Sequence, residues 1–149
     1  MLTSTIIKTQ KELDNLPNID NDTIINFLYK HLDQFGDSPK AIRECLNYAL
    51  SEQQGQGGFV VIGKIEDQLA GIVIMIETGM TDYIPEYFLV YVAVNSKLRG
   101  QGIGGKLIDE SLAKADGDVA LHVEYDNPAK RLYERLGFTS KYAEMRYKK

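Results

Sequence analysis

The sequence predicts an α/β fold of the α+β type, in which helices flank both faces of a mixed, mostly antiparallel sheet of about six strands. The order of the apolar patterns supports this class, because strand-like runs and helix-like spacings follow one another as β-α-α-β-β-β-α-β-α-β. The length of 149 residues is that of one ordinary domain. We therefore assign residues 1–149 to a single domain.

Composition and charge exclude several classes of protein. The formal net charge of -4 lacks the basic footprint of a nucleic-acid-binding protein. No run reaches the roughly 18 apolar residues of a membrane span, and the first residues lack the basic and apolar pattern of a secretory leader. We expect a cytoplasmic protein with neither nucleic acid nor membrane as a partner. The only cysteine, Cys45, excludes an internal disulfide.

The first part of the chain predicts a strand and then a helix. β-Branched side chains in residues 3–8 favour a strand, and the polar stretch up to Pro17 favours a connection or a short helix. Asp22 is placed to cap a helix that Gly36 ends. Its apolar positions are Ile24, Ile25, Leu28, Leu32 and Phe35.

A second helix is predicted to begin at Pro39, with Ser38 as its N-cap. Cys45 lies on its apolar stripe, where we expect a buried side chain without a chemical role. His31 lies among polar residues of the preceding helix, so we expect it on the surface. The glycine-rich residues 55–58 end the helix pair and predict a flexible connector.

Three apolar runs in the middle of the chain predict three neighbouring strands. Residues 59–65 and 69–78 are separated by a short polar stretch, which predicts an antiparallel hairpin with a tight turn. Residues 87–94 predict a third strand. The glycine loop RGQGIGGKL, residues 99–107, follows this strand and leads into a helix that ends near Gly117.

The last part of the chain predicts two more strands around a helix. Residues 119–125 predict a strand, and Asn127 and Pro128 open a helix that Gly137 terminates. The tail from Phe138 alternates well enough to predict a final strand.

The glycine loop fits three patterns of phosphate-binding loop: G-x-G-x-x-G, G-x-x-x-x-G-K and R-x-x-G-x-G. A glycine turn from a strand into a helix offers free backbone amides and a positive helix dipole to an anion. The ATP loop is excluded, because Leu107 stands where a hydroxyl should reach Mg²⁺. A dinucleotide fold has an acid at the expected spacing in Glu124, but too few residues follow it for the remaining parallel strands.

The third pattern belongs to a longer resemblance. VAVNSKLRGQGIGGKLIDESLAKA, followed by LHVEYDNPAKRLYERLGF, resembles the acetyl-CoA-binding half of the GNAT superfamily of N-acetyltransferases. The motifs cover residues 87–138, and the preceding residues agree in the order of their elements. The resemblance implies an enzyme that transfers acetyl from acetyl-CoA, its cosubstrate, directly to an amine of a small molecule or protein, without a metal.

The resemblance also implies roles for individual residues. Tyr133 corresponds to the general acid that protonates the departing thiolate, and Asn127 to an asparagine that contacts the pantetheine arm. The strand before the loop is expected to bulge and to pair its backbone with that arm. The cofactor-binding residues are therefore Val92, Ala93 and Val94 on the strand, the loop residues Arg99, Gly100, Gln101, Gly102, Ile103 and Gly104, and Asn127 and Tyr133.

No residue of this sequence corresponds to the general base that the family carries on the strand before the loop. An amine with a pKa of about 10.4 is almost fully protonated at neutral pH and must lose a proton before it attacks the thioester. Many members of the family carry an acid on the strand before the loop, but Val90 and Tyr91 occupy that place here. We choose Glu86, at the start of the strand, as the base. The alternatives are Glu77, Glu124, His122 and a water chain.

Two rival interpretations stay open. A module that binds or senses coenzyme A without catalysis is consistent with the missing acid, and a nucleotide-binding protein is consistent with the loop alone. The acceptor is expected between the helix pair of residues 24–50 and the hairpin. A sheet edge left open by the short tail would suit a homodimer.

Overall fold

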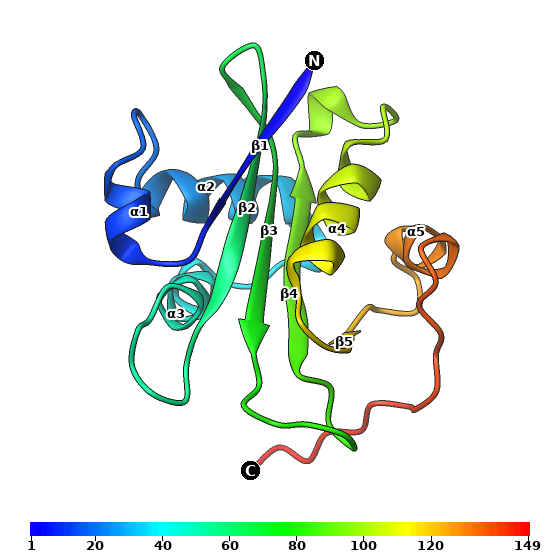
Figure 1. The fold of residues 1–149 in the computed structure, drawn as a ribbon. Helices are drawn as coiled ribbons and strands as arrows, with labels where there is room; N and C mark the ends of the chain where they lie inside the picture. The colour runs from blue at the N-terminus through cyan, green and yellow to red at the C-terminus, as the bar shows by residue number, and fades with distance from the viewer.

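The computed structural model describes residues 1–149 and has a five-stranded sheet in the order β1-β2-β3-β4-β5 (Figure 1). The strands are β1 (Leu2–Ile7), β2 (Gly58–Ile65), β3 (Gln68–Glu77), β4 (Tyr87–Val94) and β5 (Val119–Leu121). The helices are α1 (Gln10–Asp14), α2 (Asn21–Leu32), α3 (Pro39–Ala49), α4 (Ile103–Lys114) and α5 (Ala129–Arg135). None of these helices has the length and apolar character that crossing a membrane requires.

The sheet is mixed and mostly antiparallel, as the sequence predicts. The pairs β1–β2, β2–β3 and β3–β4 are antiparallel, and only β5 runs parallel to its neighbour β4. The β2–β3 hairpin closes through Glu66 and Asp67, whose φ angles of 50° and 65° suit a tight turn between twisted strands. The predicted fold class and hairpin are therefore confirmed, with five strands instead of about six.

Two hydrophobic layers hold helices on opposite faces of this sheet. Side chains alternate along β2, so that Val60 and Ile62 pack against α2 and α3, whereas Phe59 and Val61 pack on the side of α4. In Figure 1, α4 crosses in front of the sheet and α2 passes behind it. The predicted helices on both faces are confirmed.

The start of α2 differs from the prediction. Asp20, not Asp22, is the N-cap, because the Asp20 carboxylate accepts the amide hydrogen of Thr23 while the Thr23 hydroxyl reaches back to the Asp20 amide. The helix ends at Leu32, and a 3₁₀ turn covers Asp33–Phe35 before Gly36. The start of α3 is as predicted, since the Ser38 hydroxyl accepts from the Ala41 amide.

The C-terminal prediction is wrong in two respects. The strand predicted over residues 119–125 keeps only three residues, since the pairing of β5 with β4 ends at Leu121. No strand follows Phe138. The alternation there is incomplete, because Tyr142 shares a face of an extended chain with Phe138 while Met145 and Tyr147 lie on the other face. Neither face collects enough apolar surface to fix a sixth strand.

Candidate active site

Strand β4 has a free edge along its second half. Its ladder with β5 covers only Tyr87–Leu89. On the other edge, Tyr91 pairs with Ile74 and Leu89 with Met75, so that Val90 is an extra residue, a β-bulge. Beyond the bulge, the edge that includes the predicted residues Val92, Ala93 and Val94 has no strand beside it. The backbone of Val92–Val94 is therefore unpaired on this side, as the addition of an extended ligand to a sheet edge requires.

The glycine loop lies between the end of β4 and the start of α4. Gly100 and Gly102 have φ angles of 82° and 77°, and space around both is open, so glycine is required by the backbone conformation and not by crowding. Gly102 is the N-cap of α4 and provides no side-chain cap. The first backbone bond of the helix runs from the Lys106 amide to the Gly102 carbonyl. The amides before Lys106 are left for an anion.

The loop is held in place by contacts that the sequence did not reveal. The Asn95 side chain donates to the Leu69 carbonyl and accepts from the Lys97 amide. The Arg99 guanidinium donates to the backbone carbonyl of His31 at 2.7 Å, so this side chain joins the loop to α2. His31 is 7% exposed, and its Nδ1 accepts the amide hydrogen of Ser96 at 3.1 Å. The expectation that His31 lies on the surface is wrong.

This arrangement predicts a dependence of stability on pH. Burial, and then the charges of Lys30 and Arg99, lower the pKa of His31 below its ordinary value of 6.5. The neutral ring is therefore favoured in the folded chain. Its contribution to the free energy of unfolding is complete above the pKa of His31 in the unfolded chain, and it is lost as the pH falls through the pKa in the folded chain. We expect the free energy of unfolding to fall from about pH 7 to about pH 5. Urea titrations at several pH values should show a flatter dependence for His31→Gln, and an identical dependence would contradict this role.

Tyr133 lies half-buried on α5. Its ring meets that of Phe138 at a centroid distance of 5.9 Å. Burial raises the pKa of its hydroxyl, and no hydrogen bond contributes to the shift. Tyr133 also lines a cavity of about 590 Å³ together with β5, the residues that follow it and the C-terminal segment. Tyr133 therefore carries a protonated hydroxyl and lines the same cavity as β5.

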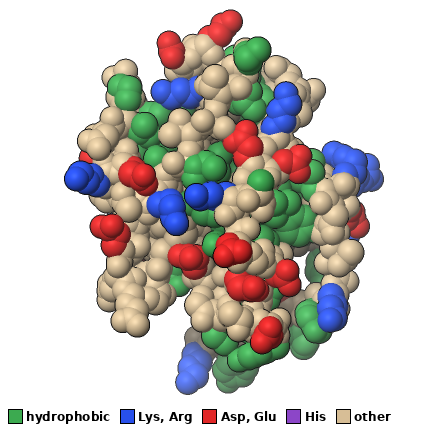
Figure 2. Space-filling model, viewed as in Figure 1, with side chains coloured by type: hydrophobic (Ala, Val, Ile, Leu, Met, Phe, Trp, Pro, Cys, Tyr) green, Lys and Arg blue, Asp and Glu red, His purple; other side chains and the backbone are tan.

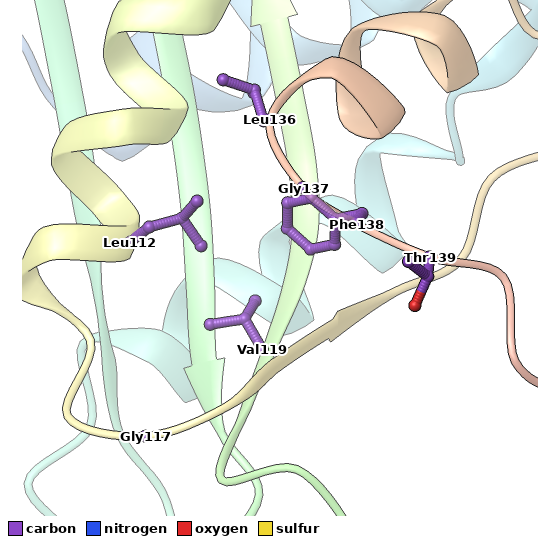
Figure 3. A pocket seen from close by; sticks show the side chains of 7 residues that line it. All are labelled: Leu112, Gly117, Val119, Leu136, Gly137, Phe138 and Thr139. Atoms are coloured by element: carbon purple, nitrogen blue, oxygen red, sulfur yellow. The ribbon is translucent and has the colours of Figure 1, made fainter.

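A second, smaller cavity of about 370 Å³ lies between the end of α4 and the residues after α5. Figure 3 shows Leu112, Val119 and Phe138 pointing toward one another across it. None of the residues predicted for cofactor binding or catalysis lines this cavity. This cavity is an apolar gap in the packing between α4 and the C-terminal segment. We do not assign the active site to it.

The remaining predicted residues, Asn127, Glu86 and the alternative base His122, do not lie at the glycine loop. Asn127 shapes the turn before α5, where its side chain accepts from the Ala129 amide at 2.9 Å. Glu86 lies at the start of β4, against Gly117 and at the opposite end of the strand from the glycine loop. The alternative base His122 is exposed and packs edge-on against Phe88. The structure thus does not bring Glu86 to the loop.

One polar pair near the free edge of β4 had no signal in the sequence. The Tyr91 hydroxyl donates to the Asp37 carboxylate at 2.6 Å, joining β4 to the segment between α2 and α3. Burial, and then this hydrogen bond, raise the pKa of Tyr91 far above its ordinary range. The two residues are far apart in the sequence, and Asp37 lies in a polar loop without periodicity. Only the tertiary structure brings them together.

Cys45 lies next to this pair and lacks the low thiol pKa that a nucleophilic cysteine needs. Burial, and then the charge of Asp37, raise the pKa of Cys45 to about 12, so the thiol stays protonated. We expect Cys45→Ala to keep its transfer rate within about twofold of the wild type, because only a thiolate attacks a thioester efficiently. Intact-protein mass spectrometry after incubation with acetyl-CoA should show no acetyl adduct on this residue. An adduct that Cys45→Ala abolishes would contradict the assignment.

Comparisons with known proteins agree with this geometry. A family model described as an acetyltransferase (GNAT) domain matches residues 50–140. The fold resembles a ribosomal-protein-alanine N-acetyltransferase from Brucella melitensis biovar Abortus 2308, with 14% identity, 99% of each chain covered and a TM-score of 0.67. It also resembles the aminoglycoside N-acetyltransferase AAC(6')-Iy in complex with CoA, with 14% identity, 100% of this chain and 96% of that chain covered, and a TM-score of 0.68.

A third structure, called a transcriptional regulator, comes from Bacillus halodurans C-125. It is 16% identical, with 98% of this chain and 99% of that chain covered and a TM-score of 0.68. No curated protein matches the chain. At these identities the structural likenesses concern the fold alone.

Proposed function

The chain belongs to the GNAT family of acetyltransferases, and we propose that it transfers the acetyl group of acetyl-CoA directly to an amine. The observation that carries the proposal is the sequence of three features along β4 and α4. The ladder of β4 with β5 stops at Leu89, beside the bulge at Val90, and the free edge that follows ends at the glycine loop with its unpaired amides. This order suits a ligand with an extended arm and a pyrophosphate at one end.

The residues fit acetyl-CoA as follows. The amides from Arg99 to Gly104 bind the pyrophosphate, and the backbone of Val92–Val94 pairs with the pantetheine arm. Asn127 contacts that arm. Tyr133 protonates the thiolate as it leaves, since a phenol can donate to a thiolate in the transition state. Glu86 remains a prediction for the base.

A thermal melt tests which ligand the loop binds. At about 100 times the dissociation constant, acetyl-CoA should add ~2.7 kcal/mol to the stability and raise the melting temperature by about 5–10 °C. ATP and NAD should raise it by much less. A Gly102→Val variant, strained at the positive φ angle of this position, should lose most of the shift with acetyl-CoA. A larger shift with ATP or NAD would instead support a nucleotide-binding protein.

The second candidate is a sensor that binds coenzyme A or an acyl-CoA without catalysis. The observation that favours it is the absence of a carboxylate from β4, since Glu86 lies just before the strand. A similar fold occurs in a protein called a transcriptional regulator. The two candidates differ in turnover, because a sensor would bind acetyl-CoA and release no thiol with any amine.

The acceptor class is open to a direct screen. The similar structures include an enzyme named for the alanine of a ribosomal protein and one named for aminoglycosides. We propose a primary amine as the acceptor. A panel of an aminoglycoside, spermidine and a peptide with a free N-terminal alanine covers small molecules and protein N-termini.

We also propose a homodimer that covers the free edge of β5. β5 pairs only with β4, and the segment after α5 exposes Tyr142, Met145 and Tyr147 by 80%, 91% and 90%. Figure 2 shows hydrophobic side chains on the surface at the lower end of the molecule. Such exposed apolar groups beside an unpaired edge favour association. Sedimentation should show a dimer, and a strictly monomeric protein at high concentration would remove this proposal.

A further inference from the structure

Tyr91 and Asp37 form a polar pair at the boundary between the core and the surface. Tyr91 is 7% exposed and lies among the apolar side chains beneath α2 and α3, whereas Asp37 is exposed. The phenol donates to one carboxylate oxygen, Oδ2, at 2.6 Å. The buried ring thereby fixes the position of a carboxylate whose remaining lone pairs face the solvent side. A fixed, exposed carboxylate is suited to bind a cation.

The position of Tyr91 on β4 places this pair near the reacting end of the proposed cosubstrate. Tyr91 directly follows the bulge residue Val90, and the ladder with β5 stops at Leu89. An arm that starts at the glycine loop and follows the free edge of β4 reaches the bulge at its far end. The acetyl group then lies near the bulge at Val90, where the alternation of side chains along β4 shifts by one residue. This position is beside Tyr91.

The charges around Asp37 favour a cationic acceptor. The segment of residues 33–38 contains two carboxylates and no lysine or arginine, and the first cation after it is Lys40 at the start of α3. Asp37 takes part in none of the ion pairs of the chain. From α3, the neighbouring Cys45 presents a protonated thiol without charge. The carboxylate is therefore available to a ligand.

We propose that Asp37, positioned by Tyr91, binds the ammonium group of the acceptor and takes up its proton. The inference rests on the acetyl transfer proposed above and names a cationic primary amine as the substrate class. The ammonium passes one proton to the carboxylate, and the free amine attacks the thioester carbon. A carbon–nitrogen bond forms and the carbon–sulfur bond breaks. The thiolate takes a proton from Tyr133, and the nitrogen releases its surplus proton to solvent.

The test compares Asp37→Asn with the wild type on the best acceptor among the aminoglycoside, spermidine and the alanine peptide. Loss of a general base lowers rates by about 10²–10⁴-fold, and we expect a loss of at least about 10²-fold in kcat/KM for the amine near pH 7. The KM for acetyl-CoA should stay unchanged. The defect should shrink as the pH approaches the pKa of the amine, because free amine needs neither the ion pair nor the base. A defect that is independent of pH would show a merely structural role.

Three further variants make the outcome specific. Asp33→Asn removes the other carboxylate of the same segment and should leave the rate unchanged. Tyr91→Phe keeps the packing of the ring but no longer holds the Asp37 carboxylate in place. We expect a loss of about tenfold in kcat/KM for the amine, and this loss should also become smaller at high pH. Glu86→Gln tests the rival base predicted from the sequence, which would show this pH-dependent loss if Glu86 and not Asp37 took up the proton. If Glu86→Gln shows the pH-dependent loss and Asp37→Asn does not, the inference is wrong.

The experiment also distinguishes this inference from the proposed function. If the wild type acetylates an amine and Asp37→Asn does so equally well at all pH values, only the role of Asp37 fails. If the wild type binds acetyl-CoA but acetylates none of the amines, the proposed transfer itself fails.

Discussion

Replacing Tyr133 by phenylalanine is expected to lower kcat by about 10²-fold or more and to change the affinity for acetyl-CoA much less, because the ring is kept. The change removes one oxygen atom and keeps the ring that packs against Phe138. Burial raises the pKa of the Tyr133 hydroxyl, so this group is protonated at neutral pH and can donate to the leaving thiolate. Without it, the thiolate leaves as an anion in a partly buried place.

Steady-state kinetics with the best amine separates the effect on kcat from the effect on the affinity for acetyl-CoA. Tyr125→Phe is a matched control, because Tyr125 is 84% exposed and lies in the turn before α5, the helix that carries Tyr133. The control should retain wild-type kcat. An unchanged kcat in Tyr133→Phe, with amide product still formed, would exclude Tyr133 as the general acid.

The largest effect on stability is expected at Leu107, a fully buried residue through which α4 packs on the sheet. Leu107→Ala should lower the free energy of unfolding by about 2–5 kcal/mol, through lost burial and a cavity. The close approach of α4 depends on Gly63 and Gly71, because a Cβ at Gly71 would lie 2.6 Å from Leu107 Cδ1. Gly71→Ala alone is therefore also destabilising, by overpacking.

A double-mutant cycle tests this packing. In Leu107→Ala/Gly71→Ala the added methyl group lies where the leucine side chain has been removed, so we expect the double variant to be more stable than the sum of the single losses by about 1 kcal/mol or more. Urea unfolding gives all four values. Strict additivity would show that the two residues do not share this space.

Local signals predicted much of the fold correctly. The β2–β3 hairpin needs only two apolar runs and a polar turn, and the start of α3 needs only Ser38 and Pro39. The glycine loop was recognised because its chemistry lies within a few consecutive residues. These features depend on neighbours in the sequence, so their physical causes can be read from it.

Features that depend on distant contacts were not predictable. His31 has the polarity of a surface residue, but it is buried because its ring packs at an angle against Phe27 and accepts from Ser96 on another segment. The short β5 depends on tertiary pairing, since its ladder with β4 stops at Leu89, next to the bulge at Val90. The Tyr91–Asp37 hydrogen bond joins a strand to a loop outside the residues matched by the family model. A single sequence shows no pattern for such a pair.

The most direct measurement is the release of coenzyme A thiol from acetyl-CoA, followed in the presence and absence of each amine of the panel. Mass spectrometry of the amine is measured in the same reaction. If the protein transfers acetyl directly to an amine, thiol release requires an amine and equals the amount of acetylated amine formed. Binding of acetyl-CoA without thiol release for any amine, or release that does not depend on the amine, would contradict it.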